Sequence, residues 1–166
     1  TPHKNEIKAA IDDMNNVIDR CVLSAKLTDQ KIKVEKQTFS MEPMVRSLAE
    51  RHGITDRLKW SAQGANDVMG DPQLMHFVLN NLLENAKKYS APNSLIEVTL
   101  LSPDRSVLQL AMKAPSPPVK WSLRVLNVPG TAGWPDADHV FDKYYRAAKS
   151  HHLAGSGLGL FIVQSL

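Results

Sequence analysis

Apolar residues recur at heptad spacing near the start of the chain, between residues 4 and 27. They follow a 4-3-4-3-4 spacing and are Ile7, Ile11, Met14, Ile18, Cys21 and Ala25. A seam this narrow is typical of a helix that packs against other helices in a bundle. An amphipathic helix folded onto its own domain would show the same pattern, because three heptads are the minimum for a coiled-coil assignment. The polar residues 28–38 then predict a linker.

A second helical pattern covers residues 71–90. Asp71 is a favourable N-cap and Pro72 loses no hydrogen bond at the first helical position, so a helix is predicted to start here. Apolar residues then recur at helical spacing and form the face expected to be buried: Leu74, Val78, Leu82 and Leu83. We expect this to be the central helix of the fold.

Shorter segments alternate between strand-like composition and turn signals. Residues 39–51 predict a short strand entering a helix that ends at Gly53. Further strands are predicted at residues 58–61, 96–101, 107–114 and 121–128, with 96–101 and 107–114 forming a hairpin, and residues 64–70 are predicted to be a turn. Because strands and helices intermix with an antiparallel component, we expect an α/β two-layer sandwich. Its mixed sheet would be covered by helices on one face and preceded by the bundle-type helix.

Composition limits the class of protein. With 166 residues, 43% of them apolar, the chain can form one domain with a real core and an appendage. The net charge is +3 and the basic residues are scattered, so we expect no nucleic-acid partner. Cys21 is the single cysteine, which excludes an internal disulfide and fits a reducing compartment. No run approaches the roughly 18 apolar residues of a membrane span and no signal peptide opens the chain, so we expect a soluble fragment.

Candidate chemistry lies on a polar stripe of the central helix. Asn81, Asn85 and Lys88 fall at i, i+4 and i+7, with Tyr89 beside them. An amide oxygen suits Mg²⁺ and a lysine one turn away can contact a phosphate, although a solvated amphipathic face would also carry these residues. Near the chain end, three glycines precede an apolar helix, where bare backbone amides can cradle phosphate oxygens: Gly155, Gly157 and Gly159. Such a loop can also be a plain turn, but both elements together favour a nucleotide site.

Three motifs occur together in the second half of the chain: NNLLENAKKYS from residue 80, VFDKYYRA at 140–147 and GSGLGL from residue 155. From residue 37 onward the chain resembles the catalytic ATP-binding domain of sensor histidine kinases of bacterial two-component systems, with their N box, F box and second glycine box in the family's order. The resemblance implies the fold of the histidine kinase, gyrase and Hsp90 ATPase superfamily. It also implies two parts: residues 1–34 as the second helix of a dimerisation hairpin with its linker, and residues 35–166 as the catalytic domain.

The resemblance implies a role for each candidate residue. Asn85, assisted by Asn81, would hold Mg²⁺, Lys88 would contact the phosphates of ATP and Tyr89 would pack near the base. Amides of the second glycine box would bind phosphate; this box contains Gly155, Ser156, Gly157, Leu158 and Gly159. Arg146 would reach the γ-phosphate. Glu84 would orient the attacking imidazole, although it could equally be an exposed helix residue.

Two segments depart from the family pattern. Asn127 stands where the first glycine box normally has an Asp that accepts a hydrogen bond from the adenine amino group. An amide oxygen can still accept that bond, although Asn is also a common turn residue, and Gly133 would close the box after an insertion of two residues. Between Arg146 and Gly155 lie eight residues, AAKSHHLA, a short ATP lid that would weaken affinity. Phe141, Tyr144 and Tyr145 of the F box are predicted to be core or lid-anchoring aromatics.

No phosphoacceptor motif surrounds any of the six histidines. The predicted reaction therefore passes the γ-phosphoryl of ATP to a histidine outside this chain, for relay to the receiver domain of a response regulator. The full-length protein would be a homodimer with this part in the bacterial cytoplasm, in some members below an inner-membrane anchor. Two alternatives remain at this point: a degenerate ATP-binding domain acting as a regulatory interaction module, which the altered glycine box and short lid motivate, and an ATPase that drives conformational change.

Overall fold

The computed structural model describes residues 32–103, 120–146 and 155–166 and, before residue 26, positions 3, 7, 10, 11, 14, 17, 18, 21–23 and 25. Contacts divide the chain into a larger unit, Val34–Trp134, and a smaller unit made of Thr1–Lys33 and Pro135–Leu166. The elements are β1 (Gln37–Ser40), α2 (Met41–His52), the 3-10 turn η1 (Thr55–Arg57), β2 (Leu58–Gln63), β3 (Asp67–Gly70), α3 (Pro72–Tyr89), β4 (Ile96–Leu101), β5 (Ser122–Asn127) and α5 (Gly159–Ser165).

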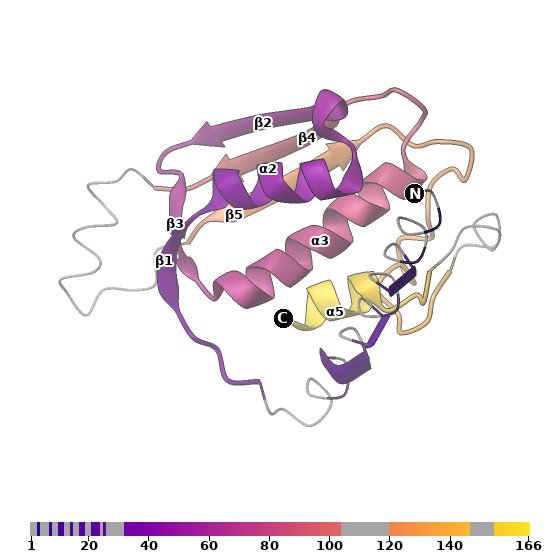
Figure 1. Ribbon diagram of the computed structural model, residues 1–166, viewed down its shortest axis with the longest axis horizontal. Helices are drawn as coiled ribbons and strands as arrows, with labels where there is room; N and C mark the ends of the chain where they lie inside the picture. Colours follow the sequence, from indigo (N-terminus) through magenta and orange to yellow (C-terminus); the bar gives the residue numbers. More distant parts are fainter. Residues whose placement is uncertain are drawn as a thin grey trace. The chain divides into compact units, whose positions relative to one another are not determined.

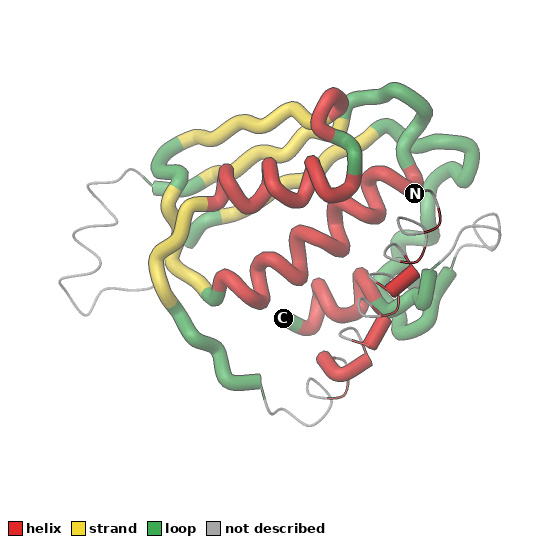
Figure 2. Tube along the Cα trace, viewed as in Figure 1, coloured by secondary structure: helices red, strands yellow, loops and turns green. Residues whose placement is uncertain are grey.

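A three-stranded mixed sheet organises the larger unit. Its order is β2-β4-β5, with β4 parallel to β2 and antiparallel to β5. Alternate residues of β4 are fully buried beneath α2 and α3, which cover one face of the sheet (Figures 1 and 2). The other face carries polar cross-strand pairs, including Lys59 with Glu97 and Ser61 with Thr99. The predicted α/β two-layer sandwich with helices on one face is confirmed.

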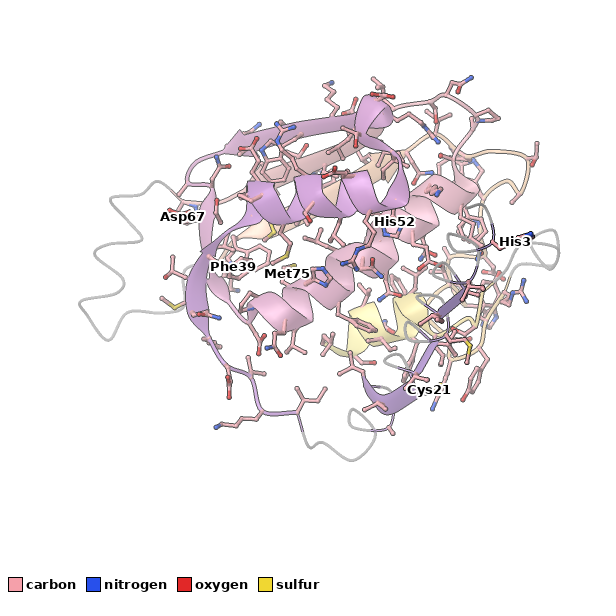
Figure 3. All side chains as sticks on the ribbon, viewed as in Figure 1. His3, Cys21, Phe39, His52, Asp67 and Met75 are labelled. Carbon is pink, nitrogen blue, oxygen red and sulfur yellow. The ribbon has the colours of Figure 1, made fainter. Side chains whose placement is uncertain are left out.

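The core of this unit lies between the sheet and the two helices. Its buried residues are Met41, Val45, Leu48, Ala49, Ile54, Val68, Leu79, Leu83, Ala86, Ile96, Val98 and Leu100. Each large aliphatic side chain in this set stabilises the fold by about 1.5–3 kcal/mol relative to exposure to water. Phe39 and Met75 pack against the same cluster at the end of the helices nearest β1 (Figure 3).

The predicted buried face of α3 was only partly right. Leu83 is fully buried, but Leu74, Val78 and Leu82 are half-buried. The core-facing stripe instead runs through Leu79, Leu83 and Ala86. Both stripes are apolar at helical spacing, so the pattern alone allowed either, and the positions of α2 and the sheet decide which one is covered.

The predicted ends of the helices are confirmed. The side chain of Asp71 accepts hydrogen bonds from the backbone N–H groups of Gln73 and Leu74, which caps α3 directly before Pro72. A further bond from the Glu35 N–H to Asp71 is the main cause that lowers the pKa of this carboxyl. At the end of α2, Gly53 adopts a left-handed conformation with φ 63°, and its N–H donates to the carbonyl of Glu50.

The predicted turn over residues 64–70 is wrong for its second half. Asp67–Gly70 form β3, which pairs antiparallel with β1 and leaves only Val68 buried. A four-residue strand bounded by Asp and Gly has no alternation long enough to distinguish it from a turn. The predicted strand at 107–114 lies outside the described residues, and the two neighbours of β4 are β2 and β5.

The positions described between residues 3 and 25 are helical. All six seam residues are exposed in the single chain, among them Ile7 at 61%, Ile11 at 51% and Met14 at 64%. Within the described residues, no helix combines the length and the hydropathy that crossing a bilayer requires. The predicted division into parts 1–34 and 35–166 rests on the sequence motifs. The contacts that define the two units do not test it, so it stays a prediction.

Two polar contacts of His52 join the end of α2 to α3. His52, the last residue of α2, lies beside α3 (Figure 3), and its Nε2 is 3.0 Å from Oδ1 of Asn80. The Lys87 ammonium donates to the backbone carbonyl of His52 at 2.7 Å, which satisfies a carbonyl at the helix C-terminus. Burial lowers the pKa of His52 below its ordinary value of 6.5, outweighing the opposing effect of the bond to Asn80.

Acidification is therefore expected to destabilise the larger unit through His52. Because the folded pKa is lowered, the unfolded chain takes up the proton first as the pH falls. The stabilisation by neutral His52 is complete above the unfolded pKa of about 6.5 and is lost as the pH falls through the folded pKa. Urea unfolding at about pH 7.5 and about pH 5.5 measures this loss, and His52→Gln should lose less. Equal losses in both proteins would assign the effect to His76 instead, because burial also lowers the pKa of that residue.

Candidate nucleotide-binding site

Asn81 on α3 has a buried side-chain oxygen that accepts no hydrogen bond from any of the described residues. The side chain is 2% exposed, and its Nδ2 donates to the backbone carbonyl of Phe77 at 2.8 Å. Within the described part of the chain, its Oδ1 is buried without a hydrogen-bond partner. Leaving such an oxygen unsatisfied costs about 1–3 kcal/mol. A ligand that brings a donor or a cation to this oxygen would recover that energy.

The rest of the predicted stripe continues along the same helix. Asn85 and Lys88 follow Asn81 at i+4 and i+7, and both are half-buried. The Lys88 ammonium lies 5.5 Å from the centre of the Tyr89 ring. Two amides, an ammonium and an aromatic ring thus share the C-terminal half of α3, which is a donor set suited to a metal-bound phosphate and a base.

Glu84 belongs to a different stripe of α3. Together with Asn80 and Lys87 it lies at i, i+4 and i+7 on the side that faces His52. Burial is the main influence on His52 and lowers its pKa, while the charge of Glu84 acts on His52 in the opposite direction. The helix therefore carries two polar stripes, one that joins it to α2 and one that holds the candidate ligands.

The end of β5 is bonded to the end of α3. Asn127, the last residue of β5, is half-buried, and the chain after it runs beside the helix end. The Ala91 N–H donates to the Val128 carbonyl and the Gly130 N–H donates to the Tyr89 carbonyl, both at 2.8 Å. These two bonds hold the strand that ends at Asn127 against the helix end that carries Tyr89.

Gly130 and Gly133 follow β5, and the structure requires or favours glycine at each position for a different reason. A Cβ on Gly130 would lie 2.8 Å from the backbone oxygen of Ser90, so the close approach of the two segments requires glycine there. Gly133 has φ 71°, and a Cβ would meet nothing within 4 Å. It therefore serves a turn, in which its N–H donates to the Gly130 carbonyl at 3.0 Å.

The glycine loop of the smaller unit is bonded to the F-box segment. The Tyr144 N–H donates to the Gly157 carbonyl at 3.0 Å. Gly157 has φ 70°, and a Cβ there would lie 2.6 Å from the backbone carbon of Tyr144. After this contact Leu158 is buried and α5 begins at Gly159. The loop is thus fixed by a backbone contact that only glycine permits.

The F-box aromatics are not core residues. Phe141 and Tyr144 are exposed by 40% and 64%, and Tyr145 is half-buried. The Lys143 ammonium lies 5.4 Å from the Tyr144 ring centre and 5.6 Å from that of Phe161 on α5. The core alternative is therefore wrong for Phe141 and Tyr144, and Tyr144 contacts the glycine loop through its backbone rather than its ring.

The predicted site residues fall into two groups. Those in the larger unit are Asn81, Glu84, Asn85, Lys88, Tyr89, Asn127 and Gly133, and those in the smaller unit are Arg146, which is half-buried, and Gly155, Ser156, Gly157, Leu158 and Gly159. Lid residues 147–154 lie outside the described residues. Sequence reasoning missed Arg57, Ser90 and Gly130, which organise the end of α3. The only available signal was the Pro129-Gly130 pair, a common turn dipeptide.

Comparison with known proteins decides the family. The family model described as histidine kinase-, DNA gyrase B-, and HSP90-like ATPase matches residues 70–166, which is more than half of the chain. The chain belongs to this ATPase family. Its nucleotide is therefore ATP, and the matched region contains the α3 stripe, the end of β5 and the glycine loop.

Relatives of the chain within the family are bacterial sensor proteins. It is 32% identical over 99 residues to the heme sensor protein HssS of Staphylococcus epidermidis, covering 58% of this chain and 18% of that protein. It is 27% identical over 171 residues to the sensor protein QseC of Salmonella typhi, covering 97% and 33%. The chain thus spans a third or less of the length of these relatives.

A solved structure confirms the fold over most of the chain. The Acinetobacter baumannii histidine kinase AdeS matches with a TM-score of 0.62 at 15% identity, over 97% of this chain and 70% of that one. The mycobacterial sensor histidine kinase MprB matches with a TM-score of 0.53 at 22% identity, over 78% of this chain and 76% of that one. The family match makes the chain an ATP-binding domain of this ATPase family, and the relatives and solved structures that it resembles are sensor proteins and sensor histidine kinases.

Proposed function

We propose that this domain binds Mg²⁺ with ATP and passes the γ-phosphoryl to a histidine outside the chain, for relay to a response regulator. The observation that carries the proposal is the buried Oδ1 of Asn81, which finds no partner within the described residues. An amide held by its nitrogen, with its oxygen unsatisfied, is costly in the free protein and useful only when a ligand completes it.

The residues of α3 fit a magnesium-bound phosphate. Asn85, assisted by Asn81, would hold the metal, because neutral amide oxygens are hard ligands of the kind that Mg²⁺ accepts. Bound magnesium would supply charge neutralisation on the phosphates. Lys88 would contact the phosphates as a point charge, and Tyr89, whose ring already lies beside the Lys88 ammonium, would pack near the base. Asn127 would accept a hydrogen bond from the adenine amino group.

The smaller unit would contribute to phosphate binding. Backbone amides of the glycine box would face the phosphate oxygens; the box contains Gly155, Ser156, Gly157, Leu158 and Gly159. Arg146 would stabilise charge on the γ-phosphoryl during transfer. Glu84 would orient the attacking imidazole, although its charge also acts on His52, whose pKa burial lowers and Glu84 raises.

The partners are part of the same proposal. The exposed heptad seam of residues 7–25 supports packing against a dimerisation hairpin, so the full-length protein would be a homodimer. The receiver domain of a response regulator would accept the phosphoryl group. Since relatives are named as sensor proteins, the domain would work in the bacterial cytoplasm as part of a protein that can be anchored in the inner membrane.

Calorimetric titration with Mg²⁺ and a non-hydrolysable ATP analogue tests the proposal. We expect saturable binding that chelation of the metal weakens, and that Asn85→Ala weakens at least about tenfold through loss of a metal ligand. Gln73→Ala, an exposed position on the first turn of the same helix, is the matched control and should bind as the unmodified chain does. A folded chain that shows no binding at about millimolar nucleotide would support a regulatory interaction module instead.

A further inference from the structure

Arg57 makes a three-bond contact with the segment that leaves α3. Its Nε donates to the Ser94 carbonyl at 2.8 Å, and its Nη2 donates to Oγ of Ser90 and to the Ala91 carbonyl at 3.3 Å. Arg57 ends the η1 turn, 33 residues before Ser90, and is half-buried. The guanidinium thus bridges acceptors at both ends of the segment Ser90–Ser94.

The acceptors belong to a tight turn at the helix C-terminus. The Ser94 N–H and hydroxyl both donate to the Ala91 carbonyl, at 3.2 and 2.8 Å, and Asn93 has φ 59°. Carbonyl groups at the end of a helix carry the negative end of its dipole, so a guanidinium at this point is also favoured electrostatically. Arg57 therefore stabilises a turn in which Asn93 adopts the left-handed conformation.

The same turn is bonded on its other side to the chain that leaves β5. Two backbone bonds join them, from Ala91 N–H to Val128 and from Gly130 N–H to Tyr89. Gly130 packs so closely on Ser90 that no Cβ fits. We call Arg57, Ser90–Ser94 and Val128–Gly130 together the exit junction. Residues bordering the junction carry the proposed base-side contacts, Tyr89 on α3 and Asn127 on β5.

We propose that Arg57 is a positioning residue for the nucleotide site. By bonding the turn at Ser90, Ala91 and Ser94, it sets where the last turn of α3 lies relative to the end of β5, and so where Tyr89 lies relative to Asn127. A planar guanidinium can donate from Nε and Nη2 to separated acceptors at once, whereas a lysine offers one point of contact. This inference rests on the proposed function for its consequence, but the junction itself does not depend on nucleotide.

Amide hydrogen exchange in the nucleotide-free chain tests the junction. Arg57→Ala should raise the exchange rates of the Ala91 and Gly130 amides at least about tenfold while the central amides of β4 keep their rates. Arg57→Lys should give an intermediate increase because it restores only part of the contact. Unchanged rates at Ala91 and Gly130 would overturn the proposal. A uniform increase that includes β4 would also overturn it, since Arg57 would then contribute only to global stability.

Nucleotide affinity tests the consequence. Arg57→Ala should weaken binding of Mg²⁺ with the ATP analogue about tenfold, and Arg57→Lys less. Arg46→Ala is the matched control, because this arginine has a side chain 60% exposed, pairs with Glu42 within α2 and should leave affinity unchanged. Equal affinity of Arg57→Ala and the unmodified chain would overturn the positioning role. Absence of binding in the unmodified chain would refute the proposed function instead, and the exchange rates would still decide whether Arg57 orders the junction.

Discussion

Replacing Asn81 by leucine is expected to weaken nucleotide binding at least about a hundredfold while leaving the free domain as stable as before, or more stable by about 1 kcal/mol. Asn81 is 2% exposed, and its Oδ1 has no hydrogen-bond partner among the described residues, so the free protein bears the cost of a buried unsatisfied acceptor. Leucine of similar size removes that acceptor and adds apolar contact. The bond from Nδ2 to the Phe77 carbonyl is lost, but that carbonyl lies inside α3 and keeps its helical partner.

The result that distinguishes a ligand-binding role for Asn81 is weaker nucleotide binding without a loss of free energy of unfolding. Titration with Mg²⁺ and the ATP analogue should show affinity reduced at least about a hundredfold, since an interaction with a charged ligand is lost in a buried place. Urea unfolding should show no loss of stability. The neighbouring Asn80→Leu is the matched control: Asn80 is also buried, but its oxygen is bonded to His52, so this change should cost about 1–2 kcal/mol and retain binding. If both changes destabilise alike, the Asn81 oxygen has a structural role and the argument for the ligand fails.

Local signals predicted the helices of the larger unit well. Asp71 and Pro72 fix the start of α3 through bonds within three residues, and Gly53 ends α2 through its left-handed conformation. The buried stripe of α3 was harder, because two apolar stripes compete and only the covering elements choose between them. For the same reason β3 was missed: its pairing with β1 joins residues about thirty positions apart along the chain.

In the candidate site, too, features set by neighbouring residues could be predicted from the sequence, and features set by distant residues could not. Motifs predicted the candidate ligands on α3 and in the glycine loop because each motif is a short run in the sequence. The contacts that hold those ligands could not be read in this way. Arg57 reaches the end of α3 from 33 to 37 residues away, and Gly130 is glycine because of Ser90, which lies 40 positions earlier in the chain. Such requirements arise only when the chain is folded, so one sequence carries no periodic or compositional sign of them.

Gly157→Ala is expected to disrupt the contact between the glycine loop and the F-box segment. The added Cβ would lie 2.6 Å from the backbone carbon and 2.8 Å from the backbone oxygen of Tyr144. Both neighbours are main-chain atoms, so no side chain can rotate away, and the hydrogen bond from the Tyr144 N–H to the Gly157 carbonyl must lengthen or break. Together with the cost of φ 70° for a residue with a Cβ, the contact should lose about 3 kcal/mol.

Gly53→Ala separates the cost of the steric clash from the cost of a positive φ. Gly53 has a similar φ of 63°, but a Cβ there meets nothing within 4 Å, so its replacement should cost only about 1 kcal/mol. Urea unfolding compares the two variants, and the amide resonance of Tyr144 should shift in Gly157→Ala alone. Nucleotide affinity should fall at least about tenfold in Gly157→Ala, because the displaced loop carries the proposed phosphate-binding amides. If both variants lose equal stability and the Tyr144 resonance does not move, the close approach of the glycine loop to Tyr144 does not order the loop, and its glycine serves only the backbone conformation.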